Sequence, residues 1–353
     1  MQTVSTEVRG RTVIVTIERP QARNAVDGPT ARQLYDAFKA FDADEALDVA
    51  ILQGRGGAFC AGADLKGVAD GRGNPVHRDG DLGPGRPVMQ TVSTEVRGRT
   101  LVVTIERPQA RNAVDGPTAR QLYDAFKAFD ADEGLDVAIL QGRGGAFCAG
   151  ADLKGVAEGR GNPVHRDGDL GPMGVTRLSL GKPVIAAIEG HAVAGGLEVA
   201  CWADLRVAAE GAVFGVFCRR FGVPLIDLGT VRLPRLIGAS RAMDLILTGR
   251  PVAAQEAYDI GLANRLAPKG GALDTALELA AQLSAFPQLC LRNDRLSAIG
   301  QWSLDWGQAT TAEIALGLET LRSGQSREGA ARFAAGEGRG GAFQAPPGRI
   351  GDP

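Results

Sequence analysis

The chain has 353 residues, of which 44% are hydrophobic, and a formal net charge of −2. This near-neutral balance excludes the strongly basic surface typical of nucleic-acid-binding or membrane-surface proteins. Its five cysteines form no C-x-x-C pair, which argues against a zinc site and favours reduced thiols. The first ten residues lack the apolar stretch of a signal peptide, and no apolar run is long enough to span a bilayer. We therefore expect a cytoplasmic protein with no metal, no nucleic-acid partner and no membrane contact.

The first quarter of the chain is repeated almost without change. Residues 1–84 recur as residues 89–172, and residues 85–88 link the two copies. The copies differ at four positions: Val13/Leu101, Ile14/Val102, Ala46/Gly134 and Asp70/Glu158. The period does not continue beyond residue 172, so the repeat is not a solenoid. The two copies could form a tandem with two half-sites, or residues 1–88 could replace residues 89–172 in a neighbour's sheet and alter assembly. We favour a partial duplication, because a repeated element normally needs neighbours to complete its core.

Both copies predict the same order of elements. Two strands over residues 4–8 and 12–17, or 92–96 and 100–105, precede a helix that opens at Pro29 or Pro117. A buried strand follows over residues 49–52, or 137–140, and then a glycine-rich loop, residues 142–154 in the second copy. The polar segment over residues 159–172 is expected at the surface.

Only the second copy continues into the rest of the chain. Residues 184–188 and 205–208 predict buried strands on either side of a helix over residues 197–202. This alternation is typical of a layered α/β fold. Four further helices are expected over residues 273–286, 291–299, 304–321 and 328–335. The resulting domain prediction is a partial duplicate over residues 1–88, a complete domain over residues 89–343, and a disordered tail over residues 344–353.

Two glycine-containing turns predict acid–base chemistry beside an exposed backbone donor. Gly195 and Gly196 open the helix that carries Glu198, so the carboxylate lies about one turn from amides that have no partner within the helix. Gly150 similarly precedes Ala151 at a second helix start. Two such amides that donate to one carbonyl oxygen form an oxyanion hole. The alternative is a glycine-assisted close packing of the helix, with Glu198 solvated.

These two segments also resemble a known family. A-F-C-A-G-A-D-L-K (residues 146–154) and G-H-A-V-A-G-G-L-E-V-A (residues 190–200) are similar to the paired signature of the enoyl-CoA hydratase/isomerase (crotonase) family. The similarity runs from residue 89 to about residue 340 and includes residues 108–114 and 233–250. It implies an α/β fold, the crotonase (ClpP-like) spiral of ββα units, with a C-terminal helical trimerisation region. It also implies an acyl-CoA substrate and a homotrimer or dimer of trimers.

The resemblance assigns roles residue by residue. It implies that the amides of Ala151 and Gly195 hold the thioester oxygen and that Glu198 is the catalytic acid or base. Coenzyme A enters as part of the substrate, so no separate cofactor is expected. The residues that the resemblance places at coenzyme A are Gln109, Ala110, Arg111, Ala149, Asp152 and Lys154.

One departure from the family pattern concerns the second catalytic carboxylate. Hydratases of the family carry a second glutamate shortly after a Phe-Gly pair, and Cys218 takes that place after Phe214-Gly215. Asp227 is a candidate replacement, although an aspartate at such a position also commonly caps a turn or a helix. The leading prediction is an enoyl-CoA hydratase; a double-bond isomerase or a non-catalytic acyl-CoA-binding homologue are the alternatives.

Overall fold

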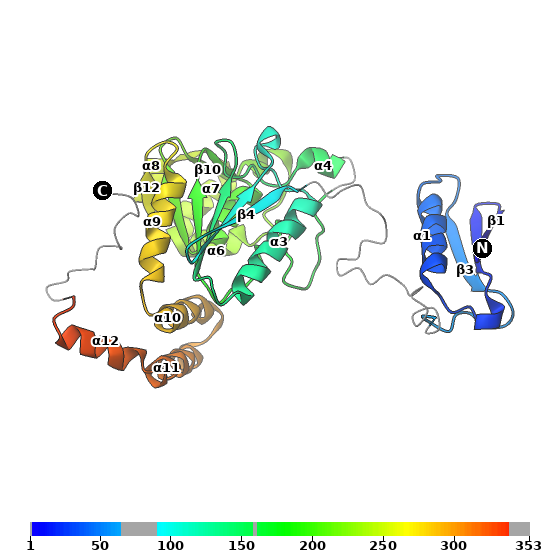
Figure 1. The fold of residues 1–353 in the computed structure, drawn as a ribbon. Helices are drawn as coiled ribbons and strands as arrows, with labels where there is room; N and C mark the ends of the chain where they lie inside the picture. The colour runs from blue at the N-terminus through cyan, green and yellow to red at the C-terminus, as the bar shows by residue number, and fades with distance from the viewer. Residues whose placement is uncertain (1, 65–89, 158–160, 339–353) are drawn as a thin grey trace, which may run out of the picture. The chain divides into compact units, whose positions relative to one another are not determined.

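The chain divides into two compact units, Met1–Val88 and Met89–Pro353, each with its own core. The computed structural model describes residues 2–64, 90–157 and 161–338 (Figure 1). The predicted tail over residues 344–353 lies outside the described residues. No helix within those three ranges is both long and apolar enough to cross a membrane.

The described part of unit 1, residues 2–64, is a three-stranded sheet covered by the helix α1 (Gly28–Asp42). The strands β1 (Val4–Arg9), β2 (Thr12–Ile17) and β3 (Val49–Gly54) lie in the order β1-β2-β3, with β1 antiparallel and β3 parallel to β2. A short η1 (Pro20–Ala22) leads to α1 (Gly28–Asp42). The apolar residues of α1 repeat at a helical spacing, and Leu34, Phe38 and Phe41 pack on the buried side chains of β1 and β2.

Unit 2 repeats this arrangement and extends it. β4 (Val92–Arg97), β5 (Thr100–Ile105), η2 (Pro108–Ala110), α3 (Gly116–Ala131) and β6 (Val137–Gly142) follow in the same order as in unit 1. β6 then pairs with β7 (Val184–Ile188), which pairs with β9 (Leu205–Ala209), and β12 (Arg265–Ala267) completes a sheet of order β12-β9-β7-β6-β5-β4. A second sheet has the order β11-β10-β8, from β8 (His191–Val193), β10 (Val213–Gly215) and β11 (Val252–Ala253).

The large sheet of unit 2 has a hydrophobic core on each face. Side chains alternate along β6, so Ala138 and Leu140 face the core that contains α3, whereas Val137 and Ile139 face α9 (Ala272–Ser284). Figure 1 shows α3 and α9 on opposite sides of this sheet. The other helices among the described residues of unit 2 are α4 (Leu153–Ala157), α5 (Gly195–Trp202), η3 (Phe217–Phe221), α6 (Gly229–Ile237), α7 (Ala239–Thr248), α8 (Ala254–Asp259), α10 (Gln288–Gly300), η4 (Gln301–Ser303), α11 (Trp306–Arg322) and α12 (Gln325–Ala334).

The predicted strands and helices are present, with boundaries that shift by a few residues. The start of α3 illustrates why: Pro117 is inside the first turn, and the helix begins at Gly116 because the carboxylate of Asp115 accepts a hydrogen bond from the Thr118 amide. Sequence patterns missed β8 and β10, which are only three residues long and have no measurable periodicity.

Candidate active site

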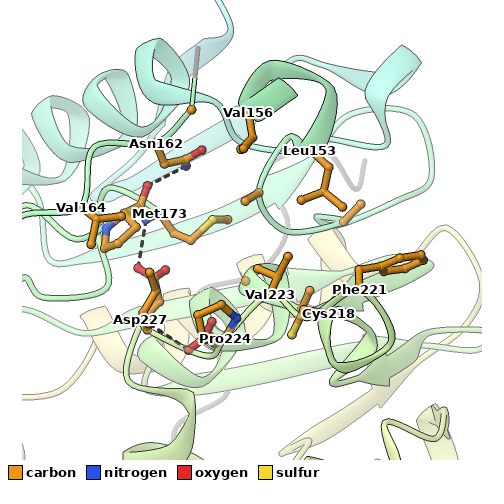
Figure 2. Close-up of a pocket in the computed structure, with 18 of the residues that line it drawn as sticks. Leu153, Val156, Asn162, Val164, Met173, Cys218, Phe221, Val223, Pro224 and Asp227 are labelled. Atoms are coloured by element: carbon orange, nitrogen blue, oxygen red, sulfur yellow. Dashed lines mark hydrogen bonds between the residues drawn. The ribbon is translucent and has the colours of Figure 1, made fainter. Parts of the chain in front are cut away.

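A cavity of about 350 Å³ in unit 2 brings together the two predicted segments. Ala151 and Gly195 lie on its wall with Glu198 and Asp227. The rest of the lining is largely apolar. Figure 2 shows Leu153 and Val156 on one side of the cavity and Cys218, Phe221 and Val223 on the other. A largely apolar cavity with a few polar groups is the usual form of a small-molecule site.

Glu198 is buried in α5, and among the described residues donors reach only one of its two carboxylate oxygens, Oε1. Its side chain is 2% exposed, so the alternative of a solvated carboxylate is wrong. Oε1 accepts hydrogen bonds from the amides of Asp227 (3.0 Å) and Gly229 (2.8 Å). Burial raises the pKa of Glu198 from 4.5 to about 7, against the effect of those two amides. A carboxyl group with this pKa can both take and return a proton near neutral pH.

The backbone beside Glu198 offers two amides. Neither the N–H of Ala151 nor that of Gly195 donates a hydrogen bond to another described residue. The two segments approach so closely that a Cβ on Gly150 would lie 2.9 Å from the Gly195 nitrogen. Hydrogen bonds from Cys148 to His191 (2.9 Å) and from Val193 to Cys148 (3.1 Å) connect them. The arrangement therefore places two free donors on the wall that also carries Glu198.

Backbone strain marks the start of α5. Ala194 has φ 54° and ψ −126°, a conformation that a residue with a Cβ rarely adopts, and its amide donates to the Gly215 carbonyl at 2.9 Å. Such strain persists only where the surroundings enforce it, and it concentrates at functional sites. Gly196 is equally constrained, because a Cβ there would lie 2.1 Å from the carbonyl oxygen of Cys148.

Asp227 is buried and forms hydrogen bonds with the loop that contains Met173 and Thr176. The first turn of α6 begins after Leu228 with no side-chain cap, so Asp227 does not cap that helix. Its Oδ1 accepts hydrogen bonds from the Met173 amide (2.9 Å) and the Thr176 hydroxyl, while its own amide donates to Glu198. Burial raises the pKa of the Asp227 carboxyl. No described residue donates to Oδ2, and the side chain lines the cavity (Figure 2).

Cys218 lines the same cavity as Glu198. The thiol lies in η3 and is 8% exposed. Burial and the neighbouring Glu198 carboxylate both raise its pKa, which keeps it protonated at neutral pH. A protonated thiol is a poor general base, so Cys218 does not reproduce the chemistry of a second glutamate.

The residues that the resemblance places at coenzyme A lie in and just after η2, in the loop before α4 and, for Lys154, in α4 itself. Gln109 and Ala110 form η2, and Arg111 follows in the left-handed conformation with its carbonyl accepting from the Ala149 amide at 3.1 Å. Asp152 has a structural task, since its carboxylate pairs with Arg107 at 2.7 Å and accepts from the amides at the start of α4. Burial alone would raise the pKa of Asp152, but these bonds hold that pKa below its usual value.

Sequence reasoning missed most of the apolar wall. Val164 and Asn162 come from the segment expected only as surface loop, Met173 and Ile226 come from two further loops, and Phe221 is the last residue of η3. Their types vary and their spacing follows no helix or strand period, so only the fold brings them together.

Known proteins share extended sequence similarity with this chain. The sequence model described as "Enoyl-CoA hydratase/isomerase" matches residues 8–80 and 95–341, which together are most of the chain. The chain belongs to the enoyl-CoA hydratase/isomerase family. The first match lies in the first copy of the repeat and the second in unit 2.

Relatives and solved structures of the family are similar over about two thirds of the chain. Enoyl-CoA hydratase EchA19 of Mycobacterium tuberculosis is 38% identical over 68% of this chain and 92% of that protein. Mevalonyl-coenzyme A hydratase SIDH of Beauveria bassiana is 36% identical over 66% and 88%. The crystal structure of an enoyl-CoA hydratase from M. tuberculosis H37Rv matches with a TM-score of 0.66 at 39% identity, over 69% of this chain and 96% of that one. The predicted crotonase fold is confirmed.

Proposed function

We propose that the chain is an enoyl-CoA hydratase that acts on acyl-CoA thioesters through an enolate. The observation that carries this is the position of Glu198: a buried carboxyl group with a pKa of about 7 and one available oxygen, on the same cavity wall as two free amides. Related proteins are named enoyl-CoA hydratase, mevalonyl-coenzyme A hydratase and carnitinyl-CoA dehydratase, and each of these names refers to an acyl-CoA.

In the proposed reaction, Glu198 removes a proton from water as the water oxygen bonds to the β-carbon of the enoyl thioester. The π electrons move onto the thioester oxygen, where the amides of Ala151 and Gly195 stabilise the enolate. Removing one donor from such a site typically lowers the rate by about 10²–10³-fold. The enolate then collapses, and its α-carbon takes a proton from Glu198 or from Asp227, which gives the 3-hydroxyacyl thioester.

Isomerisation is the second candidate, because Cys218 occupies the place of the second glutamate. A single carboxyl group suffices to move a proton from one carbon of an enoyl chain to another, as Glu198 could do without Asp227. A non-catalytic acyl-CoA-binding protein is the third candidate; tight binding without turnover would support it.

We propose that coenzyme A lies along the loops of Gln109–Arg111 and Ala149, with Lys154 near its phosphates. Asp152 would then act by fixing the loop between these groups rather than by touching the ligand. The active unit spans residues 89–343 in this proposal, and residues 1–88 are a partial duplicate of its first part. The five unpaired cysteines are consistent with a reducing, cytoplasmic location.

The proposed assembly is a homotrimer or a dimer of trimers. Support comes from the C-terminal helices, which leave large apolar side chains uncovered: Trp306 is 89% exposed, Leu321 62% and Phe333 63%. Light scattering on the purified chain measures this directly, and a monomeric mass at assay concentration contradicts it.

The decisive experiment compares wild type with Glu198→Gln on crotonyl-CoA and, separately, on a 3-enoyl-CoA. We expect wild type to hydrate crotonyl-CoA, with a loss of about 10²-fold or more in the variant at unchanged circular dichroism. Full activity of the variant contradicts the assignment of Glu198. Turnover of the 3-enoyl-CoA alone identifies the isomerase, and binding of both thioesters without turnover identifies the non-catalytic protein.

A further inference from the structure

Three apolar side chains of unit 1 are exposed, whereas their counterparts in the repeated sequence of unit 2 are buried. Val49 and Ile51, which lie on one side of β3 and which we call the open face, are 50% and 47% exposed, and Phe59 in the loop after β3 is 60% exposed. Their counterparts in unit 2 are all 0% exposed: Val137, Ile139 and Phe147. The difference is local, because Val8 and its counterpart Val96 are both 60% exposed.

Unit 2 shows what covers the open face. The outer edge of β6 pairs with β7, with Ile139 opposite Ile185, and α9 packs on the same side of the sheet. In unit 1, β3 has only β2 beside it among the described strands. An aspartate at equivalent positions of the two units differs in the same way. In unit 2 the side chain of Asp136 is 1% exposed and accepts a hydrogen bond from Arg292 of α10 at 2.9 Å, whereas in unit 1 the side chain of Asp48 is 57% exposed.

Unit 1 has nevertheless already formed the loop that unit 2 contributes to the cavity. The amide of Val26 donates to Gly62 at 2.8 Å and that of Asp64 donates to Val26 at 2.9 Å, which places Ala63 in a bridge with Val26. The counterparts Val114, Gly150, Ala151 and Asp152 form the same bonds at 2.8 and 2.9 Å. Unit 1 therefore presents the strand edge, the apolar face and the loop in the form that unit 2 uses.

The sequence differences between the copies are compatible with exchange. Val13 replaces Leu101 and Ile14 replaces Val102, so one methylene is lost and one gained at adjacent positions of the same strand. Cores tolerate substitutions that conserve total volume. Ala46 replaces Gly134, where a Cβ would meet only the Asp132 side chain, at 3.0 Å.

We propose that unit 1 of one chain can take the place of residues 89–152 in a second copy of this chain, against β7 and α9. Unit 1 then packs against the same side chains as the copy it displaces, so the exchange depends on chain concentration and on the integrity of the resident copy rather than on new interactions. The Ala63 amide then occupies the position of the Ala151 amide beside Glu198 of the second copy. The exchange itself does not depend on the proposed hydratase activity.

The test co-expresses two full-length variants. The first carries Ile51→Asp and Ile139→Asp, which place a charge in both docking faces while Glu198 stays intact. The second carries Glu198→Gln and Ile139→Asp, so that its unit 1 is the only intact docking copy. Each variant alone is expected to be inactive, and the pair is expected to regain at least 10-fold more crotonyl-CoA hydration than either. A tag on the first variant should also recover more soluble protein from the pair.

The matched control adds Ile51→Asp to the second variant, which is a change of an exposed side chain in unit 1. A second measurement avoids buried charges: Ile51→Cys in one chain and Ile185→Cys in another should give a disulfide-linked dimer on oxidation, in excess of Val8→Cys with Ile185→Cys. The proposal is overturned if the pair gains neither activity nor soluble yield over the control and the linked dimer does not exceed the Val8 level. Recovery of soluble protein without activity supports the exchange and counts against the hydratase assignment alone.

Discussion

Replacing Glu198 with glutamine should stabilise unit 2 while it removes activity. The native site raises the pKa of this carboxyl group from 4.5 to about 7, because burial disfavours the charged form. The unfolded chain therefore loses the proton at lower pH than the folded chain does. Between pH 4.5 and 7 the folded state binds more protons, so the contribution of Glu198 to stability decreases as the pH rises. Glutamine keeps an oxygen for the Asp227 and Gly229 amides and carries no charge.

The magnitude follows from the size of the shift. Each pKa unit corresponds to about 1.4 kcal/mol, so the full penalty is about 3 kcal/mol above pH 8 and about 1 kcal/mol at pH 5. The Glu198→Gln protein should exceed wild type in free energy of unfolding by these amounts, with no difference below pH 4.

The assay is denaturant unfolding followed by tryptophan fluorescence. All three tryptophans lie in unit 2, and Trp202 is on the same helix as Glu198, so unit 1 does not contribute to the signal. Glu278→Gln, at an exposed position of α9, is the control for loss of one negative charge. Equal stability of wild type and Glu198→Gln at both pH 8 and pH 5 would refute the argument that burial controls this carboxyl group.

Three further predictions concern the same site. If Glu198 acts first as a base, kcat/KM for crotonyl-CoA should rise with pH through an apparent pKa near 7, and a flat profile from pH 5 to 8 would exclude that role. Cys218→Glu should raise the rate of hydration by about 10-fold or more, because it adds a carboxylate to the cavity wall, whereas Cys218→Ser should not. An unchanged rate in the glutamate variant would mean that Asp227 or Glu198 already supplies the acid–base function. Gly196→Ala should destabilise unit 2 by about 1–3 kcal/mol, because the added Cβ would lie 2.1 Å from a backbone oxygen. Gly317→Ala in α11, where the added Cβ meets open space, should instead stabilise unit 2 by up to about 1 kcal/mol. Thermal unfolding of both variants distinguishes a steric clash from a general effect of alanine.

The sequence by itself determined the local elements and the chemistry of the two signature segments. Strand and helix patterns depend on near neighbours, which is why β7, α5 and β9 were predicted close to their observed bounds. The glycines before Ala151 and Glu198 indicated free amides because glycine permits backbone geometry that other residues avoid, as Gly150 does with φ 95°.

The tertiary structure determined the burial and the electrostatic environment of these residues. The Glu198 carboxyl group accepts hydrogen bonds from the amides of Asp227 and Gly229, some thirty residues away in the chain, and a Cβ on Gly229 would lie 2.8 Å from its side chain. The two copies of the repeat make the point directly, since Ile51 and Ile139 have the same local sequence but are 47% and 0% exposed. Local sequence forms the same strand in both units; only the presence of β7 and α9 beside it determines whether its outer face is core or surface.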